Sequence, residues 1–240
     1  MRLGDKDPLA VELTAAIRSG DLVAVKRLLD AHPGLAAVRI EGEKGGSCTP
    51  LLVAADWPGF FPNGGAMVRL LIAAGADPNA RTGGEGLGES PLHWAASSDD
   101  AEVAEALIQG GADMDAPDGS IGTPLANAVG YGCWQVADLL IGRGARVGSL
   151  WEAAALGKMT DIEARFAAEP GPGAEEINHA FWQACHGGQP RAAAYLLDRG
   201  AALGWMPAYA KEPALAAAKG RGTRWGLMES WLRDHGATDM

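Results

Sequence analysis

The sequence has few cysteines, no long hydrophobic run and a shortage of positive charge, and each of these excludes a class of protein. The three cysteines, Cys48, Cys133 and Cys185, are odd in number and far apart. This is typical of free thiols in a reducing compartment, so we expect the cytoplasm. No run of about 18 apolar residues occurs, so we expect no transmembrane helix. Residues 1–21 contain acidic residues and no uninterrupted apolar segment, which argues against a signal peptide.

The charge balance and the histidine spacing exclude two further kinds of site. The 20 Lys and Arg against 30 Asp and Glu give a net charge of −10. Such a chain repels phosphate backbones, so we expect no nucleic-acid partner. The C-terminal basic residues alternate with acidic ones and indicate a solvated face; they are Lys211, Lys219, Arg221, Arg224 and Arg233. The histidines show no metal-ligand spacing, and no cofactor motif is present, so we predict neither metal nor cofactor.

An internal repeat is the main feature that the sequence does have. Residues 90–116 predict a helix that starts at Ser90-Pro91, a turn, and a second helix over about residues 101–109. Gly110 and Gly111 end the second helix. The same plan starts again at Thr123, 33 residues later. Thr49 begins an upstream copy with about five extra residues, around 57–64.

Further, weaker copies extend this plan along nearly the whole chain. Leu-x-x-x-Gly-Ala recurs at the expected end of the second helix, with its glycine at Gly75, Gly111, Gly144, Gly200 and Gly236. The pattern predicts a single domain over residues 1–240. Its about seven helix-turn-helix repeats cover residues 8–35, 49–80, 90–116, 123–147, 149–172, 178–203 and 212–238. Because one helix pair cannot bury its apolar face alone, the repeats should stack as a solenoid.

These residues resemble the ankyrin repeat family. The matches are Thr/Ser-Pro-Leu-(His)-x-Ala-Ala at the first helix and Leu-Leu/Ile-x-x-Gly-Ala-Asp-x-Asn/Asp at the end of the second. They are strongest over residues 49–147. The resemblance implies an all-α ankyrin-repeat solenoid whose projecting loops (residues 40–48, 81–89, 116–122 and 203–211) and first helices line a concave face. It also implies that His93 is structural and hydrogen-bonds the turn.

The insertion Trp57-Pro58-Gly59-Phe60-Phe61-Pro62-Asn63 is the main candidate site, because the solenoid does not need it for packing. Small residues at the ends of neighbouring first helices predict a recess beside it. We expect its walls to be aromatic and its rim to be acidic (Asp56, Asp99 and Asp100). The predicted binding residues are Trp57, Phe60, Phe61, Tyr131, His186, Trp205 and Tyr209, the last two overhanging from a loop. The alternative is a hydrophobic lid that packs on the solenoid.

The remaining motifs have plainer structural interpretations. Cys185 falls at a packing position and is expected to be a buried thiol, so Cys185-His186 is not a nucleophile and base. The glycine-rich residues 83–88 lack the Lys-Ser/Thr of a phosphate loop and indicate a projecting finger. Trp94, Trp134 and Trp231 are expected in the core. Trp151 and Trp182 are expected either to stack on each other or to face a groove.

Two hypotheses of function follow. The first is a monomeric module that binds a protein or peptide, with a basic segment as a reasonable partner because the rim is acidic. The second is a cofactor-free isomerase, cyclase or hydratase that acts on an apolar small molecule. It would use Asp56, Asp99 or His186 as general acid or base. We favour the binding module, because no triad, metal set or cofactor motif accompanies these residues.

Overall fold

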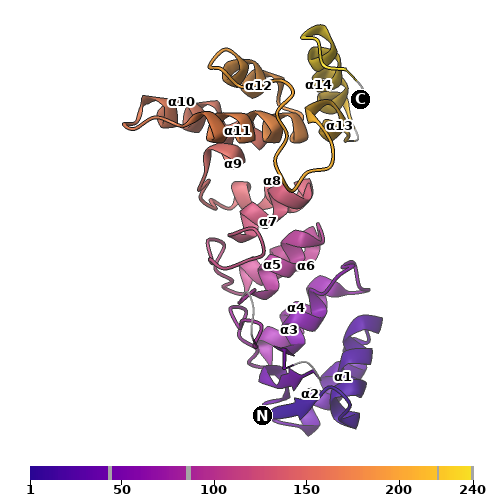
Figure 1. Ribbon diagram of the computed structural model, residues 1–240. Helices are drawn as coiled ribbons and strands as arrows, with labels where there is room; N and C mark the ends of the chain where they lie inside the picture. The colour runs from indigo at the N-terminus through magenta and orange to yellow at the C-terminus, as the bar shows by residue number, and fades with distance from the viewer. Residues whose placement is uncertain (43–44, 85–87, 221, 239–240) are drawn as a thin grey trace. The chain divides into compact units, whose positions relative to one another are not determined.

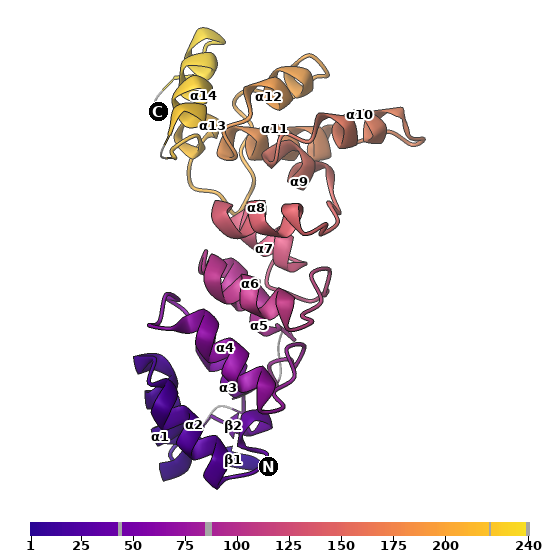
Figure 2. The same cartoon turned by 180° about the vertical axis from the view of Figure 1, so that it is seen from behind.

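The structure is a computed structural model that describes residues 1–42, 45–84, 88–220 and 222–238. The chain divides into two compact units, Met1–Arg146 and Val147–Met240, which we describe separately. The prediction of a single domain over the whole chain therefore stays a prediction. Figures 1 and 2 show successive helices paired along each unit.

The first unit is built from stacked helix pairs. Its helices are α1 (Pro8–Ser19), α2 (Leu22–Ala31), α3 (Pro50–Ala54), α4 (Gly64–Ala73), α5 (Pro91–Ser97), α6 (Ala101–Gln109), α7 (Pro124–Tyr131) and α8 (Trp134–Gly142). A short 3-10 helix, η1, covers Leu35–Ala37. First helices contact the first helices of the next pair, and second helices contact second helices. Leucines and alanines fill these interfaces, Leu92, Leu107 and Leu125 being fully buried.

The second unit continues the alternation of first and second helices. It contains α9 (Leu150–Ala155), α10 (Met159–Ala167), α11 (Ala174–His186), α12 (Pro190–Leu197), α13 (Ala214–Ala217) and α14 (Thr223–Asp234). The long helix α11 is central, since α9, α12 and α13 all pack on it. Its buried face, with Phe181 and Cys185, lies in the core of this unit.

The first helices begin where side chains cap their free amides. Thr123 accepts a hydrogen bond from the Ala126 amide at 3.2 Å. In the first repeat, where no Thr-Pro start is present, Asp7 accepts from the Leu9 amide at 2.9 Å and Pro8 occupies the first turn. Asp-Pro thus replaces Thr-Pro, because any short acceptor can serve as the cap.

The recurring glycines end the second helices in the predicted way. Gly75, Gly111, Gly144, Gly200 and Gly236 have φ values of 94°, 93°, 91°, 93° and 90°. A Cβ at any of them would meet no atom within 4 Å, so steric crowding is not the reason for glycine at these positions. The left-handed backbone selects it, because only glycine adopts this conformation freely.

A small sheet near the N-terminus was not expected. Strands β1 (Arg2–Gly4), β2 (Arg39–Glu41) and β3 (Ser47–Cys48) lie in the order β1-β2-β3. β1 pairs parallel to β2, with Leu3 opposite Ile40, and β2 pairs antiparallel to β3. The expected projecting loop at residues 40–48 therefore includes parts of β2 and β3, while its residues 43–44 lie outside the described residues. Strands of two or three residues are too short to show an alternating pattern in the sequence.

Three tryptophans expected in the core are partly buried, and Trp231 packs against the core of the second unit. Trp94, Trp134 and Trp231 each keep part of their surface exposed. The Trp94 indole N–H donates to Glu89 Oε2 at 2.9 Å. Helices that approach through alanines leave no room for an indole between them, and the polar ring edge needs a partner.

The other two tryptophans find partners other than each other. Trp151 lies 5.8 Å from His179 between ring centroids, and Trp182 stacks on His186 at 5.6 Å with 16° between the ring planes. The described ring contacts therefore pair each indole with a histidine, and the expected Trp151–Trp182 stack is not among them.

His93 connects one helix start to the next projecting loop. Its Nδ1 accepts from the Ser90 amide at 3.2 Å, and its Nε2 lies 3.1 Å from the Gly122 carbonyl oxygen. A neutral ring with its proton on Nε2 satisfies both contacts. His93 is fully buried, and burial lowers its pKa. The predicted structural histidine is confirmed.

This arrangement predicts a stability that falls in mild acid. The unfolded chain binds a proton at residue 93 near the ordinary histidine pKa of about 6.5, whereas the folded chain resists it. The contribution of His93 to the free energy of unfolding is therefore fully present above about pH 6.5, and it is lost as the pH falls toward the lowered pKa. We expect His93→Gln to lose about 1–3 kcal/mol at neutral pH and to show a shallower loss in acid. Urea unfolding across this pH range measures both.

A matched control separates titration from simple destabilisation. Leu107→Ala should cost about 2–5 kcal/mol, because it opens a cavity in the core. It removes no titrating group, so its pH slope should equal that of the unmutated chain. An unchanged slope in His93→Gln would contradict the proposed role of the ring.

Candidate interaction surface

The insertion between α3 and α4, residues 56–63, is anchored through its backbone and polar groups. We call it the aromatic loop. The Phe60 amide donates to Asp100 Oδ2 at 2.7 Å, and the Asn63 side-chain amide donates to the Gly20 carbonyl at 3.0 Å. Asp56 pairs with Arg18 at 2.6 Å. Both neighbouring helix pairs therefore hold the loop in place.

Two glycines, Gly59 in the loop and Gly64 at the start of α4, allow close approach to the helix pair that follows. A Cβ at Gly59 would lie 2.9 Å from the Cβ of Ser98, and a Cβ at Gly64 would lie 2.8 Å from Val103. Gly59 also has a φ of 77°. The contact surface of the loop is thus glycine and backbone rather than aromatic rings.

Two of the three aromatic rings of the loop face solvent. Trp57 is 77% exposed and Phe60 is 64% exposed, while Phe61 is half-buried. Phe60 has a φ of 57°, a conformation that costs free energy in a bulky residue. Neither burial of the side chain nor a favourable backbone conformation explains why a phenylalanine occupies position 60. A hydrophobic lid would bury these rings, so their exposure favours an interaction surface.

Two of the glycines behind the predicted recess, one in each unit, lie against other groups of their own unit, and the recess itself stays a prediction. At Gly130 a Cβ would lie 2.4 Å from Ile121 Cδ1, so the Ile121 side chain already fills that space. At Gly187 the Ala155 carbonyl oxygen approaches to 2.0 Å of the Cβ position. Tyr131 is exposed, and its hydroxyl donates to Ser120 Oγ at 3.2 Å. These glycines permit close packing within each unit.

The three aspartates of the predicted rim, two of which are also the acid or base candidates Asp56 and Asp99, are engaged in structural contacts. Asp99 accepts from the Val136 amide at 3.0 Å and from Gln135 at 3.2 Å, which caps the start of α8. Asp100 is buried and accepts from the Val103 amide at 3.1 Å at the start of α6. Asp56 is held in its ion pair with Arg18. Each carboxylate thus joins neighbouring helix pairs or the loop.

The other predicted site residues belong to the second unit. His186 stacks on Trp182, and its carbonyl accepts from the Trp225 indole at 3.0 Å. Trp205 and Tyr209 lie beside His179 in a cavity of about 730 Å³. Because these residues and the aromatic loop are in different units, the expected overhang stays a prediction.

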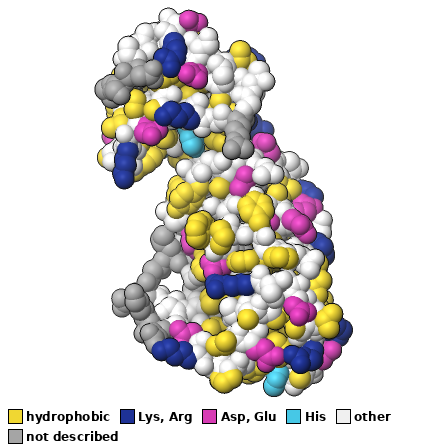
Figure 3. Space-filling view, turned by 90° about the vertical axis from the view of Figure 1, so that its right-hand side faces the viewer, with side chains coloured by type: hydrophobic (Ala, Val, Ile, Leu, Met, Phe, Trp, Pro, Cys, Tyr) yellow, Lys and Arg dark blue, Asp and Glu magenta, His cyan; other side chains and the backbone are white. Residues whose placement is uncertain are grey.

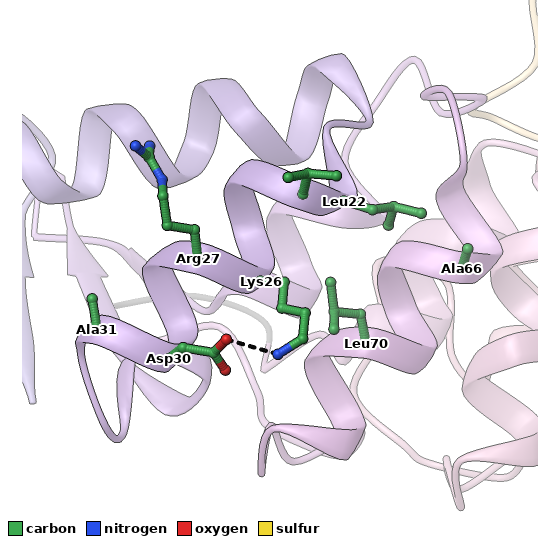
Figure 4. A pocket seen from close by; sticks show the side chains of 8 residues that line it. Leu22, Lys26, Arg27, Asp30, Ala31, Ala66 and Leu70 are labelled. Carbon is green, nitrogen blue, oxygen red and sulfur yellow. Dashed lines mark hydrogen bonds and ion pairs between the residues drawn. The ribbon is translucent and has the colours of Figure 1, made fainter.

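An apolar groove on the first unit was not foreseen from the sequence. It has a volume of about 780 Å³ and lies between α2 and α4, lined by Leu22, Val23, Ala66 and Leu70 among others (Figure 4). The ion pair Lys26–Asp30 stands at its edge, at 2.7 Å. On the face drawn in Figure 3, hydrophobic side chains gather with charged ones between them. The groove arises from two helices far apart in sequence, so no local motif reveals it.

The thiols are unsuited to nucleophilic chemistry. All three cysteines are free. Burial raises the pKa of Cys133 to about 11 and raises the pKa of Cys185 further. Since the thiolate is the reactive form, both are packing residues, and the prediction of a buried Cys185 is confirmed.

The residues that the structure describes contain no group of three or more His, Cys, Asp or Glu side chains placed to hold a metal ion. Within the same residues, no helix is long and apolar enough to cross a membrane. Part of the predicted finger (residues 85–87) and Arg221 of the basic cluster lie outside the described residues.

The stacked helix pairs with capped starts and glycine ends define a helical repeat protein. Residues 61–149 match a family model described as ankyrin repeats (3 copies). This part of the chain carries ankyrin repeats, and with the mostly helical structure it fits an all-α repeat solenoid. The total of seven repeats stays a prediction. Comparison with curated proteins gives no significant match.

The anchoring of the aromatic loop predicts that its rings contribute little to folding. Trp57→Ala should change the free energy of unfolding by less than about 1 kcal/mol, as exposed substitutions do. Phe60→Gly should stabilise the chain by a few tenths to about 1 kcal/mol, because glycine relieves the positive φ. Urea denaturation of each variant measures these changes.

Asp100→Ala is the matched contrast within the same loop contact. It removes both the cap of α6 and the acceptor of the Phe60 amide, so it should cost about 1–3 kcal/mol. A loss of several kcal/mol in Trp57→Ala would instead mean that the ring is part of the core.

Proposed function

We propose that the protein is an interaction module that binds a protein or peptide partner through the aromatic loop and its concave face. The observation that carries this proposal is the exposure of Trp57 and Phe60 on a loop with fixed anchors. Exposed aromatic side chains held in place lose little conformational entropy on binding, and aromatics are enriched at interface hot spots. Ankyrin repeats are generally protein–protein interaction modules, which agrees with this use.

The chemistry of the partner follows from charge and from the rings. The net charge of −10 favours a basic partner over an acidic one. Apolar side chains of the partner would cover Trp57 and Phe60. The acid–base alternative gains no support from its candidate residues, because Asp56 and Asp99 are held by Arg18 and by α8. The three free thiols support the reducing cytoplasm as its location.

Peptide selection tests this function directly. A random peptide library panned against the intact chain should yield sequences with basic and apolar residues. Trp57→Ser with Phe60→Ser should weaken the selected peptides by about tenfold or more, since hot-spot truncations cost about 2 kcal/mol. Isothermal titration calorimetry measures the loss.

Val23→Ser is the matched control. Val23 is 81% exposed and apolar, but it lies on α2 beside the groove of Figure 4 rather than in the aromatic loop. Peptide affinity should be unchanged in this variant. Peptides that bind the Trp57/Phe60 variant as well as the unmutated chain would refute the role of the loop.

A further inference from the structure

The second unit contains a cavity whose walls are aromatic and whose edge is acidic. Its volume is about 730 Å³, and its lining includes His179, Trp205, Tyr209, Glu175 and Glu176. The ring centroids of His179 and Trp205 are 6.2 Å apart, and those of His179 and Tyr209 are 5.9 Å apart with 78° between the planes. Three rings from α11 and the loop before α13 thus face one space.

Hydrogen bonds hold two of these rings, those of His179 and Tyr209, in place. The Tyr209 hydroxyl lies 2.7 Å from His179 Nε2 and accepts from the Gln183 side-chain amide at 3.0 Å. Gln183 is only 3% exposed, so it holds Tyr209 from inside the unit. Tyr209 itself is 63% exposed, which leaves its ring open to a ligand. Burial lowers the pKa of His179 and so favours its neutral ring.

The charges around the cavity are negative. Glu175 and Glu176 lie exposed in the first turn of α11. The start of a helix attracts anions with about half a positive charge. Two carboxylates in its own first turn outweigh that attraction, and the lining residues include no lysine or arginine. An anionic ligand is therefore repelled.

Gln183 supports the cavity wall from inside the unit. Its side-chain nitrogen donates to the Tyr209 hydroxyl, and its Oε1 atom is buried. Gln183 is not among the residues that line the cavity, so its role is to hold the tyrosine in place.

The second unit already contains a cation–π contact between a charged side chain and two aromatic rings. The guanidinium carbon of Arg199 lies 3.3 Å from the Tyr195 ring centroid and 5.4 Å from that of Phe166. Those two rings meet edge to face at 5.5 Å. The cavity at His179 presents rings at similar spacing, with carboxylates in addition. Cation–π attraction and the two carboxylates act together on a positive group placed there.

We infer that this cavity binds the side chain of a lysine or arginine from a basic segment of the protein partner. The inference rests on the proposed binding function and adds a second contact point, in the second unit. A neutral aromatic ligand would leave the carboxylates unused, and an anion would be repelled by them.

Titration with single amino-acid derivatives tests the cavity without a partner. The probes are the Nα-acetyl methylamides of lysine, arginine and norleucine, the last being the neutral analogue. The readout is the indole N–H signal of Trp205 in a proton–nitrogen NMR spectrum, assigned by its loss in Trp205→Leu. We expect saturable shifts with lysine and arginine and at least about tenfold weaker binding of norleucine.

Charge variants complete the test. Glu175→Gln with Glu176→Gln should weaken lysine binding about threefold to tenfold. Glu163→Gln with Glu169→Gln removes the same charge from exposed positions of the second unit that do not line the cavity. That control should bind like the unmutated chain.

Several outcomes would overturn the inference. Equal binding of norleucine would show a merely apolar cavity, and stronger binding of acetate would show an anion site. Absence of any shift in a chain whose spectrum is that of a folded protein would also refute it. The peptide test depends on Trp57 and Phe60 of the first unit, whereas these titrations report on Trp205 of the second, so failure of the one is distinguishable from failure of the other.

Discussion

The structure depends on close contact between neighbouring helix pairs, because no pair here can bury its apolar side alone. Helix α3 has five residues and α13 has four, far fewer than an isolated helix needs for stability. Alanines such as Ala95 and Ala128 are fully buried and let first helices approach one another. Short polar side chains then complete each junction, as Asp99 does for α8 and His93 does for the Gly122 loop.

This division of work leaves the connecting segments open to other uses. The helices and their caps supply the stability. The aromatic loop and the cavity at His179 present side chains that are not buried in the core. Both surfaces are supported from behind by buried polar groups, Asp100 in the first unit and Gln183 in the second. Rigid support for exposed rings is what an interface needs, because it limits the entropy lost on binding.

Local signals made the helices predictable, and nonlocal contacts made the surfaces unpredictable. Thr-Pro and Ser-Pro starts and the Gly-Ala endings each depend on a few adjacent residues, so the sequence indicates α5, α6 and the positive φ at Gly111. The insertion at Trp57 was visible as a departure from the repeat. The exposure of its rings was not, because it depends on Asp100 and Gly20, which are distant in sequence. The sheet and the cavity at His179 likewise arise only when separate segments meet.

The anchors of the aromatic loop also affect how its sequence can evolve. Its contacts with the scaffold use backbone amides, glycines and Asn63, none of which requires an aromatic residue at positions 57 or 60. The anchoring of the loop and the recognition that we propose for it therefore depend on different residues of the same eight-residue segment, 56–63. A lineage can exchange those two side chains and acquire a different partner while the selection that maintains the solenoid remains unaffected.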